Sequence, residues 1–164
     1  MARLNQIEAG GRNVLAFLDM LAWAEGTSRS RHTKDDGYDI VVDGIDSPKV
    51  FSDYRKHPNI LVTVNSRGLK STAAGRYQLL NRWYEPYRKL LGLKDFGPES
   101  QDKIAIQQIR ERRAMDDIRS GRIEQAIDRC RNIWASLPGA GYGQPEHKLA
   151  ELIKQYRLAG GHAV

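Results

Sequence analysis

Cysteine is almost absent from this chain. Cys130 stands alone among 164 residues, so no internal disulfide can form. Long apolar runs are missing too, and no stretch approaches the roughly 20 apolar residues of a membrane-spanning helix. The first twelve residues are polar and lack the apolar centre of a signal peptide. We therefore expect a protein that is made in a cytosol, has no stable membrane association and depends on another agent for any release.

Motifs for metals, nucleotides and covalent catalysis are also lacking. The four histidines are scattered, with no pair at metal-ligand spacing, and three lie in polar loop or terminal stretches where solvated side chains are the default. The glycine-rich stretch 138–144 has neither the Gly-x-Gly-x-x-Gly spacing nor a Gly-Lys-Ser/Thr ending. Cys130 lies among apolar residues at helical spacing, which indicates an inert buried thiol. We expect neither a metal nor another cofactor.

The charge balance is positive, with 26 Lys and Arg against 20 Asp and Glu and a formal net charge of +6. This favours an anionic partner, and nucleic acid, acidic lipid and an anionic cell-wall polymer all qualify. The arginines between residues 110 and 131 are interleaved with acidic residues, a pattern typical of a solvated, ion-paired helix surface. We therefore expect a monomer that binds no nucleic acid.

The composition, 40% hydrophobic and 28% charged, is that of a soluble globular protein. Residues 1–11 show no periodicity and are expected to form a loose lead-in. The polar, turn-rich segment 27–67 contains short β-prone runs and predicts a small antiparallel lobe beside a cleft. The strand candidates are residues 38–42, 51–54 and 60–64. The whole predicts an α+β fold, mainly helical, in a single two-lobed domain over 1–164.

Apolar residues at helical spacing predict helices in the remainder of the chain. The expected helices cover residues 13–25, 73–91, 98–113, 122–134 and 145–159. Ser71 and Thr72 are plausible N-terminal caps of the second of these helices. Pro86 lies inside its pattern and is expected to kink or split it near Glu85, because proline lacks the backbone N–H that a helix interior uses.

Glu25 is the most conspicuous candidate for chemistry. Val14, Leu18, Leu21 and Glu25 follow one another by four, three and four positions, so a carboxylate ends an otherwise apolar helical stripe. Gly26 follows as a helix stop, which places Glu25 at the negative end of the helix dipole. Burial and the dipole both raise a carboxyl pKa, and an acid that stays protonated near neutral pH suits general acid catalysis. The alternative is a solvated Glu25 at a frayed helix end.

A second candidate is the stretch 71–78, where small residues let a ligand or another helix approach closely. Its polar and aromatic members are Arg76, Tyr77 and Gln78, a mixture of donors and a ring that suits sugars. Close helix packing with Tyr77 in the core is the alternative, and spacing alone favours it. The loop 138–144 is expected to shape one end of a groove, with Tyr142 as a ring for a ligand.

Several runs of the chain form a distinctive set. They are residues 16–23, 25–27, 37–39, 70–72, 75–78 and 132–144. Together they closely resemble the bacteriophage lambda endolysin family of lytic transglycosylases, and the likeness extends from about Leu15 to Gly161. The chain departs from that pattern in a longer N-terminus, in Ala74 where the family has glycine, and in the loops 28–34 and 43–49.

The resemblance implies a lysozyme-like fold with a saccharide groove between two lobes. It also implies an enzyme that cleaves the MurNAc–GlcNAc β-1,4 bond of peptidoglycan without consuming water and so causes host cell lysis. Glu25 matches the single catalytic acid, which donates to the glycosidic oxygen and then takes the proton of the sugar's C6 hydroxyl as a 1,6-anhydro ring closes. Substrate-binding positions implied by the likeness are Tyr77, Gln78 and Tyr142, with Ser71 and Arg76 beside them. Synthesis in the host cytoplasm and action in the periplasm after holin-mediated release are implied as well.

Two alternatives stay open at this point. A hydrolysing muramidase on the same fold would use an aspartate of the segment 35–43 to hold a water, and Asp35, Asp36 and Asp39 are the candidates. A basic module without catalysis would instead bind nucleic acid or a wall polymer.

Overall fold

The computed structural model describes residues 1–143 and 145–164, and the chain divides into two compact units. The first unit contains residues 1–25 and 105–164, and the second contains residues 26–104. Helices dominate the chain, and the strands form one small antiparallel sheet in the described residues. The predicted α+β class, mainly helical with a small antiparallel sheet, is confirmed.

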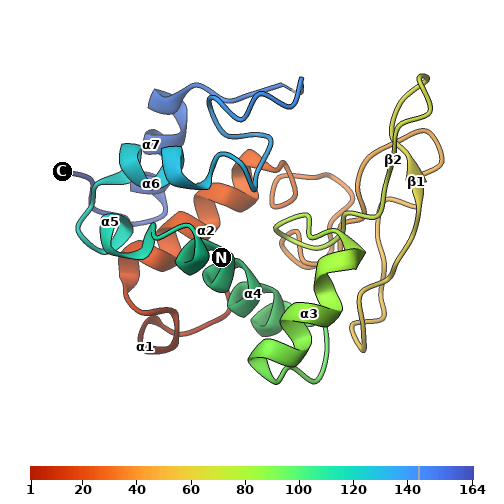
Figure 1. Cartoon of the computed structure of the whole chain (residues 1–164), viewed down its shortest axis with the longest axis horizontal. Helices are drawn as coiled ribbons and strands as arrows, with labels where there is room; N and C mark the ends of the chain where they lie inside the picture. The colour runs from red at the N-terminus through yellow and green to blue at the C-terminus, as the bar shows by residue number, and fades with distance from the viewer. Residues whose placement is uncertain (144) are drawn as a thin grey trace. The chain divides into compact units, whose positions relative to one another are not determined.

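The first unit is built around α2 (Figure 1). Its helices are α1 (Gln6–Ala9), α2 (Arg12–Ala24), α5 (Met115–Arg119), α6 (Ile123–Cys130) and α7 (Leu149–Leu158), with α4 (Pro98–Glu111) entering the unit at residue 105. The apolar stripe of α2 is fully buried at Val14, Phe17, Leu18 and Leu21, and α5 and α7 pack against that helix. Cys130 is buried as predicted, and burial raises the pKa of its thiol to about 12.

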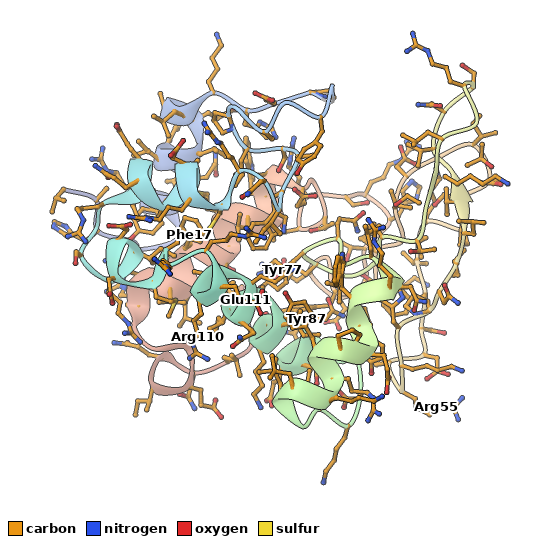
Figure 2. The ribbon with its side chains drawn as sticks, viewed as in Figure 1. Phe17, Arg55, Tyr77, Tyr87, Arg110 and Glu111 are labelled. Carbon is orange, nitrogen blue, oxygen red and sulfur yellow. The ribbon has the colours of Figure 1, made fainter. Side chains whose placement is uncertain are left out.

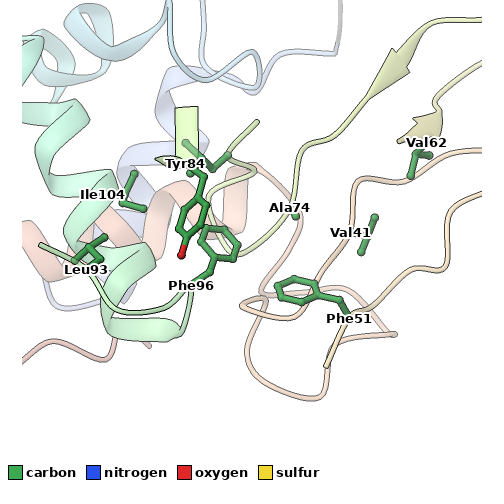
Figure 3. Close-up of a cluster of buried hydrophobic side chains, with 9 residues drawn as sticks. Val41, Phe51, Val62, Ala74, Tyr84, Leu93, Phe96 and Ile104 are labelled. Atoms are coloured by element: carbon green, nitrogen blue, oxygen red, sulfur yellow. The ribbon is translucent and has the colours of Figure 1, made fainter. Parts of the chain in front are cut away.

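The second unit contains α3 (Asn81–Leu91) and the strands β1 (Val62–Thr63) and β2 (Lys70–Ser71). The two strands pair antiparallel, with Val62 opposite Ser71 and Thr63 opposite Lys70. A cluster of buried side chains forms the core of this unit (Figure 3). Its members are Val41, Phe51, Val62, Ala74, Leu79, Tyr84, Leu93, Phe96 and Ile104.

The β structure is sparser than the sequence predicts. β1 lies inside the candidate 60–64, whereas β2 was not expected. The other two candidates form no strand, and isolated bridges pair Ile40 with Val50 and Val41 with Ala74. Polar and turn-forming residues interrupt each apolar run, so the ladders stop after one or two pairs.

The predicted helix over 73–91 begins eight residues late, at Asn81. Gly75 and Gln78 have φ of +81° and +52°, which a right-handed helix cannot include. Ala74 and Leu79 exchange two backbone hydrogen bonds, and the N–H of Gly75 donates to the carbonyl of Ile40 at 2.8 Å. These pairings take the backbone groups that helix formation would need. The N-cap position of α3 is Leu80 rather than Ser71 or Thr72, but the Thr72 hydroxyl does accept from the N–H of Asn81, the first helical residue, at 3.1 Å.

Pro86 does not split α3, which runs unbroken from Asn81 to Leu91. The expected split near Glu85 is therefore wrong, whereas the alternative of a kink stays a prediction. Pro86 lies in the second turn, where its missing N–H removes one intrahelical hydrogen bond. The side chain is exposed, so the ring meets no packing conflict in the core.

The first eleven residues are not a loose lead-in. Asn5 caps α1 by accepting from the N–H groups of Ile7 and Glu8, and the Glu8 carboxylate accepts from the N–H of Asn5. Leu4 and Ala9 are buried. This reciprocal cap was readable as Asn-x-x-Glu, although the helix it starts is only four residues long.

Helix ends elsewhere differ from the expectations by a few residues. α6 stops at Cys130 rather than near Trp134, α7 begins at Leu149 rather than Pro145, and α5 was not predicted. α4 starts at Pro98 as expected. Within the residues that the structure covers, no helix has both the length and the apolar content to cross a membrane.

Candidate functional site

Glu25 is the residue at which α2 ends. Its φ and ψ of −69° and −8° are still helical, and its N–H donates to the carbonyl of Leu21 at 2.8 Å. Gly26 follows with φ +76°, so the chain leaves the helix through a left-handed residue. The side chain of Glu25 is partly buried. The predicted helix end and the partly buried setting are therefore both present.

A hydrogen bond from Ser136 holds the carboxyl group of Glu25. The hydroxyl of Ser136 donates to Oε1 of Glu25 at 2.5 Å. Burial raises the pKa of Glu25 above its usual value, while the Ser136 hydrogen bond and the charge of His147 act in the opposite direction. Burial is the largest of these effects, so the group is biased towards the protonated form that an acid catalyst needs.

His147 contacts three parts of the first unit. Its Nε2 lies 3.1 Å from the carbonyl oxygen of Ala24, and its ring centroid lies 4.7 Å from that of Trp23. The backbone N–H of His147 donates to the carbonyl of Ser136 at 3.0 Å. On its other edge, Nδ1 lies 3.3 Å from Oε2 of Glu151 on α7.

The loop between Ser136 and His147 is closed by its own hydrogen bonds. The Glu146 carboxylate accepts from the N–H groups of Gly139 and Gly141 at 2.8 and 2.9 Å, which lowers its pKa. Tyr142 is 55% exposed, and its hydroxyl donates to the carbonyl of Asn132 at 2.7 Å. The predicted loop is present and offers the Tyr142 ring to solvent. Residue 144, the last of the glycine-rich stretch, lies outside the described residues.

Arg76 and Tyr77 are buried in the second unit, at 1% and 5% exposure. The Tyr77 hydroxyl (Figure 2) donates to Oδ1 of Asp102 at 2.6 Å, and the Tyr38 hydroxyl donates to the same oxygen at 2.7 Å. Arg76 donates to the Tyr77 hydroxyl at 3.1 Å and pairs with Asp36 at 3.3 Å. Their burial agrees with the packing alternative, and their predicted contacts with substrate stay predictions.

Gln78 and Ser71 are both partly exposed. Gln78 has a left-handed backbone, and its side-chain amide donates to the carbonyl of Gly75 at 3.0 Å. Ser71 lies in β2, and its hydroxyl accepts from the N–H of Ala73 at 3.1 Å. Their substrate contacts stay predictions, as does that of Tyr142.

Ser136 and His147 were not singled out as site residues in the sequence. Ser136 belonged to one of the runs that carried the resemblance, yet nothing local marks a serine in a loop as the partner of a distant glutamate. His147 and His57 depart from the expectation of solvated histidines, since His57 is 2% exposed and His147 is partly buried. Among the described residues, no group of three or more His, Cys, Asp or Glu side chains is placed to hold a metal ion.

Comparisons with known proteins agree on one family. A family model described as endolysin matches residues 15–163. The endolysin of Escherichia phage lambda is 61% identical over 147 residues, which cover 89% of this chain and 90% of that protein. The endolysin of Escherichia phage P2 is 58% identical over 155 residues, covering 92% and 94%.

Solved structures give the same result. Bacteriophage lambda lysozyme complexed with a chitohexasaccharide superimposes with a TM-score of 0.87 at 56% identity, over the whole of both chains. A second structure of lysozyme from bacteriophage lambda gives 0.83 at 54% identity, again over both whole chains. The predicted lysozyme-like fold and the family resemblance are confirmed.

Proposed function

The chain belongs to the endolysin family, peptidoglycan-degrading phage lysozymes that lyse cells, and from this premise we propose that it is a lytic transglycosylase. Its substrate would be the glycan strand of peptidoglycan. It would cleave the MurNAc–GlcNAc β-1,4 bond and leave a 1,6-anhydro-MurNAc end.

The observation that carries the proposal is the setting of Glu25. Its pKa is raised by burial, and its recorded side-chain hydrogen bond comes from the Ser136 hydroxyl. Protonated Glu25 would donate its proton to the glycosidic oxygen as the bond from C1 to that oxygen breaks. The positive charge that develops at C1 is oxocarbenium-like. The carboxylate left on Glu25 would accept the proton of the C6 hydroxyl while that oxygen bonds to C1, so the proton returns to Glu25 and no water is consumed.

A hydrolase would instead need a second carboxylate to activate or replace water. The aspartates named for that role have structural partners. Asp35 accepts from the Tyr54 hydroxyl at 2.7 Å, and Asp36 pairs with buried Arg76. Asp39 is 5% exposed and accepts from Thr33 and from the N–H of Lys34. These bonds support a mechanism with one carboxylate.

The glycan partner is supported by two further observations. A lambda lysozyme that aligns over the whole chain is complexed with a chitohexasaccharide. The formal net charge of +6 suits a wall polymer that carries carboxylates. We assign Tyr142, whose ring is exposed, as the first glycan contact to test, with Ser71 and Gln78 next.

We also propose that the protein is made in the host cytoplasm and acts in the periplasm after a holin opens the inner membrane. Expression in a Gram-negative host with and without a holin tests this. Rapid lysis is expected with the holin, and equally rapid lysis without it would contradict the proposed route.

Product masses from digested peptidoglycan test the reaction itself. Anhydro-muropeptides are expected. They should be lighter than the hydrolysed products by one water molecule, about 18 Da, because no water is added when the bond breaks. Reducing MurNAc ends would identify a hydrolase and refute the transglycosylase. The Glu25→Gln variant should produce neither, while its circular dichroism spectrum matches that of the unmodified protein.

A further inference from the structure

We propose that His147 is a positioning residue for Glu25, acting through the carbonyl of Ala24 and the backbone of Ser136. It holds the end of α2 so that Ser136 binds Oε1 of Glu25 and the acidic proton resides on Oε2. The inference rests on the proposed role of Glu25 as the acid and names a residue that would set the orientation of that acid.

The first step of the argument concerns the end of α2. The last carbonyl groups of a helix have no intrahelical partner and need another donor. Nε2 of His147 lies 3.1 Å from the carbonyl oxygen of Ala24, the residue directly before Glu25. A carbonyl only accepts, so Nε2 carries a hydrogen and donates to it. The imidazole also lies against Trp23, one residue further back. The ring therefore contacts the two residues that directly precede Glu25 and so restrains the backbone that carries its side chain.

The second step concerns Ser136. The backbone N–H of His147 donates to the Ser136 carbonyl at 3.0 Å, and the Ser136 hydroxyl donates to Oε1 of Glu25 at 2.5 Å. One residue thus holds both the helix end and the serine that binds the carboxyl group. Because Oε1 accepts the serine hydrogen, the proton of the neutral acid belongs on Oε2.

The other edge of the imidazole keeps the ring in place. Nδ1 lies 3.3 Å from Oε2 of Glu151, which is on α7 and 48% exposed. Glu151 and Glu25 are thus the two acidic groups that act on this ring, from α7 and from the end of α2. In the charged imidazole both nitrogens carry hydrogens, so Nε2 donates to Ala24 while Nδ1 donates to Glu151, and this pair of bonds favours one orientation of the ring.

Two amide variants separate the two edges of the ring. The side-chain nitrogen of glutamine can reach the place of Nε2 and keep a donor to Ala24, whereas that of asparagine reaches only the place of Nδ1, which faces Glu151. The backbone bond to Ser136 survives in both, so a lower kcat in Asn than in Gln assigns the effect to the Ala24 contact, and the reverse order would assign it to Glu151. His162→Gln is the matched control, because His162 is an exposed histidine of the same unit outside this contact set.

The experiment measures kcat and KM for the full-length variants on soluble, uncross-linked glycan strands. Anhydro and reducing ends are both counted, so kcat measures cleavage by either mechanism. The ratio of the two kinds of end tests the transglycosylase proposal separately. His147→Ala and His147→Asn should lower kcat by about ten- to a hundredfold with KM changed less than threefold, since a small misplacement of a catalytic group costs that much. His147→Gln should restore kcat to within about fivefold, and His162→Gln should match the unmodified protein.

Melting temperatures and pH profiles complete the test. If His147 were merely structural, Gln and Asn would lower the melting temperature and kcat alike, and that result would overturn the proposal. Unchanged kcat in His147→Ala would also overturn it. Glutamine and asparagine both lack the imidazole charge that lowers the pKa of Glu25, so the alkaline limb of the kcat profile should move to higher pH in both variants. A larger displacement in Asn than in Gln would support the positioning role, and equal displacements together with equal losses of kcat would overturn it.

Discussion

Replacing Ser136 by alanine removes the hydrogen bond to Oε1 of Glu25, and the predicted result is a higher pKa for that glutamate. The bond favours the carboxylate, because a hydroxyl donates more strongly to a charged oxygen than to a neutral one. A hydrogen bond to a charged group contributes about 1.5–3 kcal/mol. The same bond to the neutral acid contributes about 0.5–1.5 kcal/mol, so its loss removes about 1–1.5 kcal/mol of preference for the carboxylate. One pKa unit corresponds to about 1.4 kcal/mol, so the pKa should rise by about one unit.

The assay is the pH dependence of kcat/KM for glycan cleavage. A general acid must be protonated to act, so its ionisation produces the alkaline limb of the profile. In Ser136→Ala this limb should move to higher pH by about one unit. The plateau rate should fall, because the carboxylate that forms after proton donation loses its donor. Ser136→Thr keeps a hydroxyl and should leave the limb close to its original position.

Two results would refute this reasoning. An alkaline limb that does not move in Ser136→Ala would mean that the 2.5 Å hydrogen bond has no influence on the ionisation of Glu25. A limb that moves to lower pH would mean that Ser136 favours the protonated form. Circular dichroism of the variant serves as the folding control.

Three further predictions concern stability. Burial lowers the pKa of His57 in the folded state, so its contribution is present above the unfolded pKa of about 6.5 and is lost as pH falls through the lower folded value. His57→Gln should therefore flatten the decline of the melting temperature below pH 6.5. Tyr77→Phe removes a hydrogen bond to buried Asp102 and should lower the melting temperature by about 3–12 °C with kcat unchanged within twofold, since such a bond contributes about 1.5–3 kcal/mol and each kcal/mol is about 2–4 °C at this chain length. A tenfold loss of kcat would instead place Tyr77 at the substrate. The raised pKa of Glu25 stabilises the fold below its unfolded pKa, and that stability is lost as pH rises through the folded value, so Glu25→Gln should melt higher than the unmodified protein at alkaline pH. A lower melting temperature there would contradict the burial of this carboxyl group.

The parts of the fold that the sequence predicted well are those set by local periodicity. α2 ends within one residue of the expected position, because the apolar stripe and Gly26 mark its end. α4 starts at Pro98, where proline and the following glutamate favour a helix N-terminus. The segment 72–79 has similar local signals, but Ala74 and Gly75 bond to Leu79 and Ile40 instead. The spacing of apolar residues cannot predict the bond to Ile40, which is distant in the sequence.

The candidate site divides along the same line. Glu25 was predictable because it ends an apolar helical stripe. Its partners were not, because Ser136 lies 111 residues further along the chain and His147 reaches back over 123 residues to Ala24. Arg76 and Tyr77 show what residue type alone leaves open. Their types suit a sugar site, and in the fold both are buried, with Arg76 paired with Asp36 and the Tyr77 hydroxyl bonded to buried Asp102.

A mechanism with a single carboxylate places opposing demands on Glu25. The group must be protonated before the glycosidic bond breaks, which burial favours, and it must then persist as a carboxylate until it takes the C6 proton. Burial alone would make that second state costly. The Ser136 hydroxyl and the charge of His147 both lower the pKa of Glu25, so they stabilise the carboxylate that burial opposes. An enzyme with two carboxylates can divide these tasks between two environments. With one carboxylate, a single environment must allow both the protonated and the charged form. Substitutions that remove the partners of the charged form should therefore slow ring closure more than they weaken glycan binding.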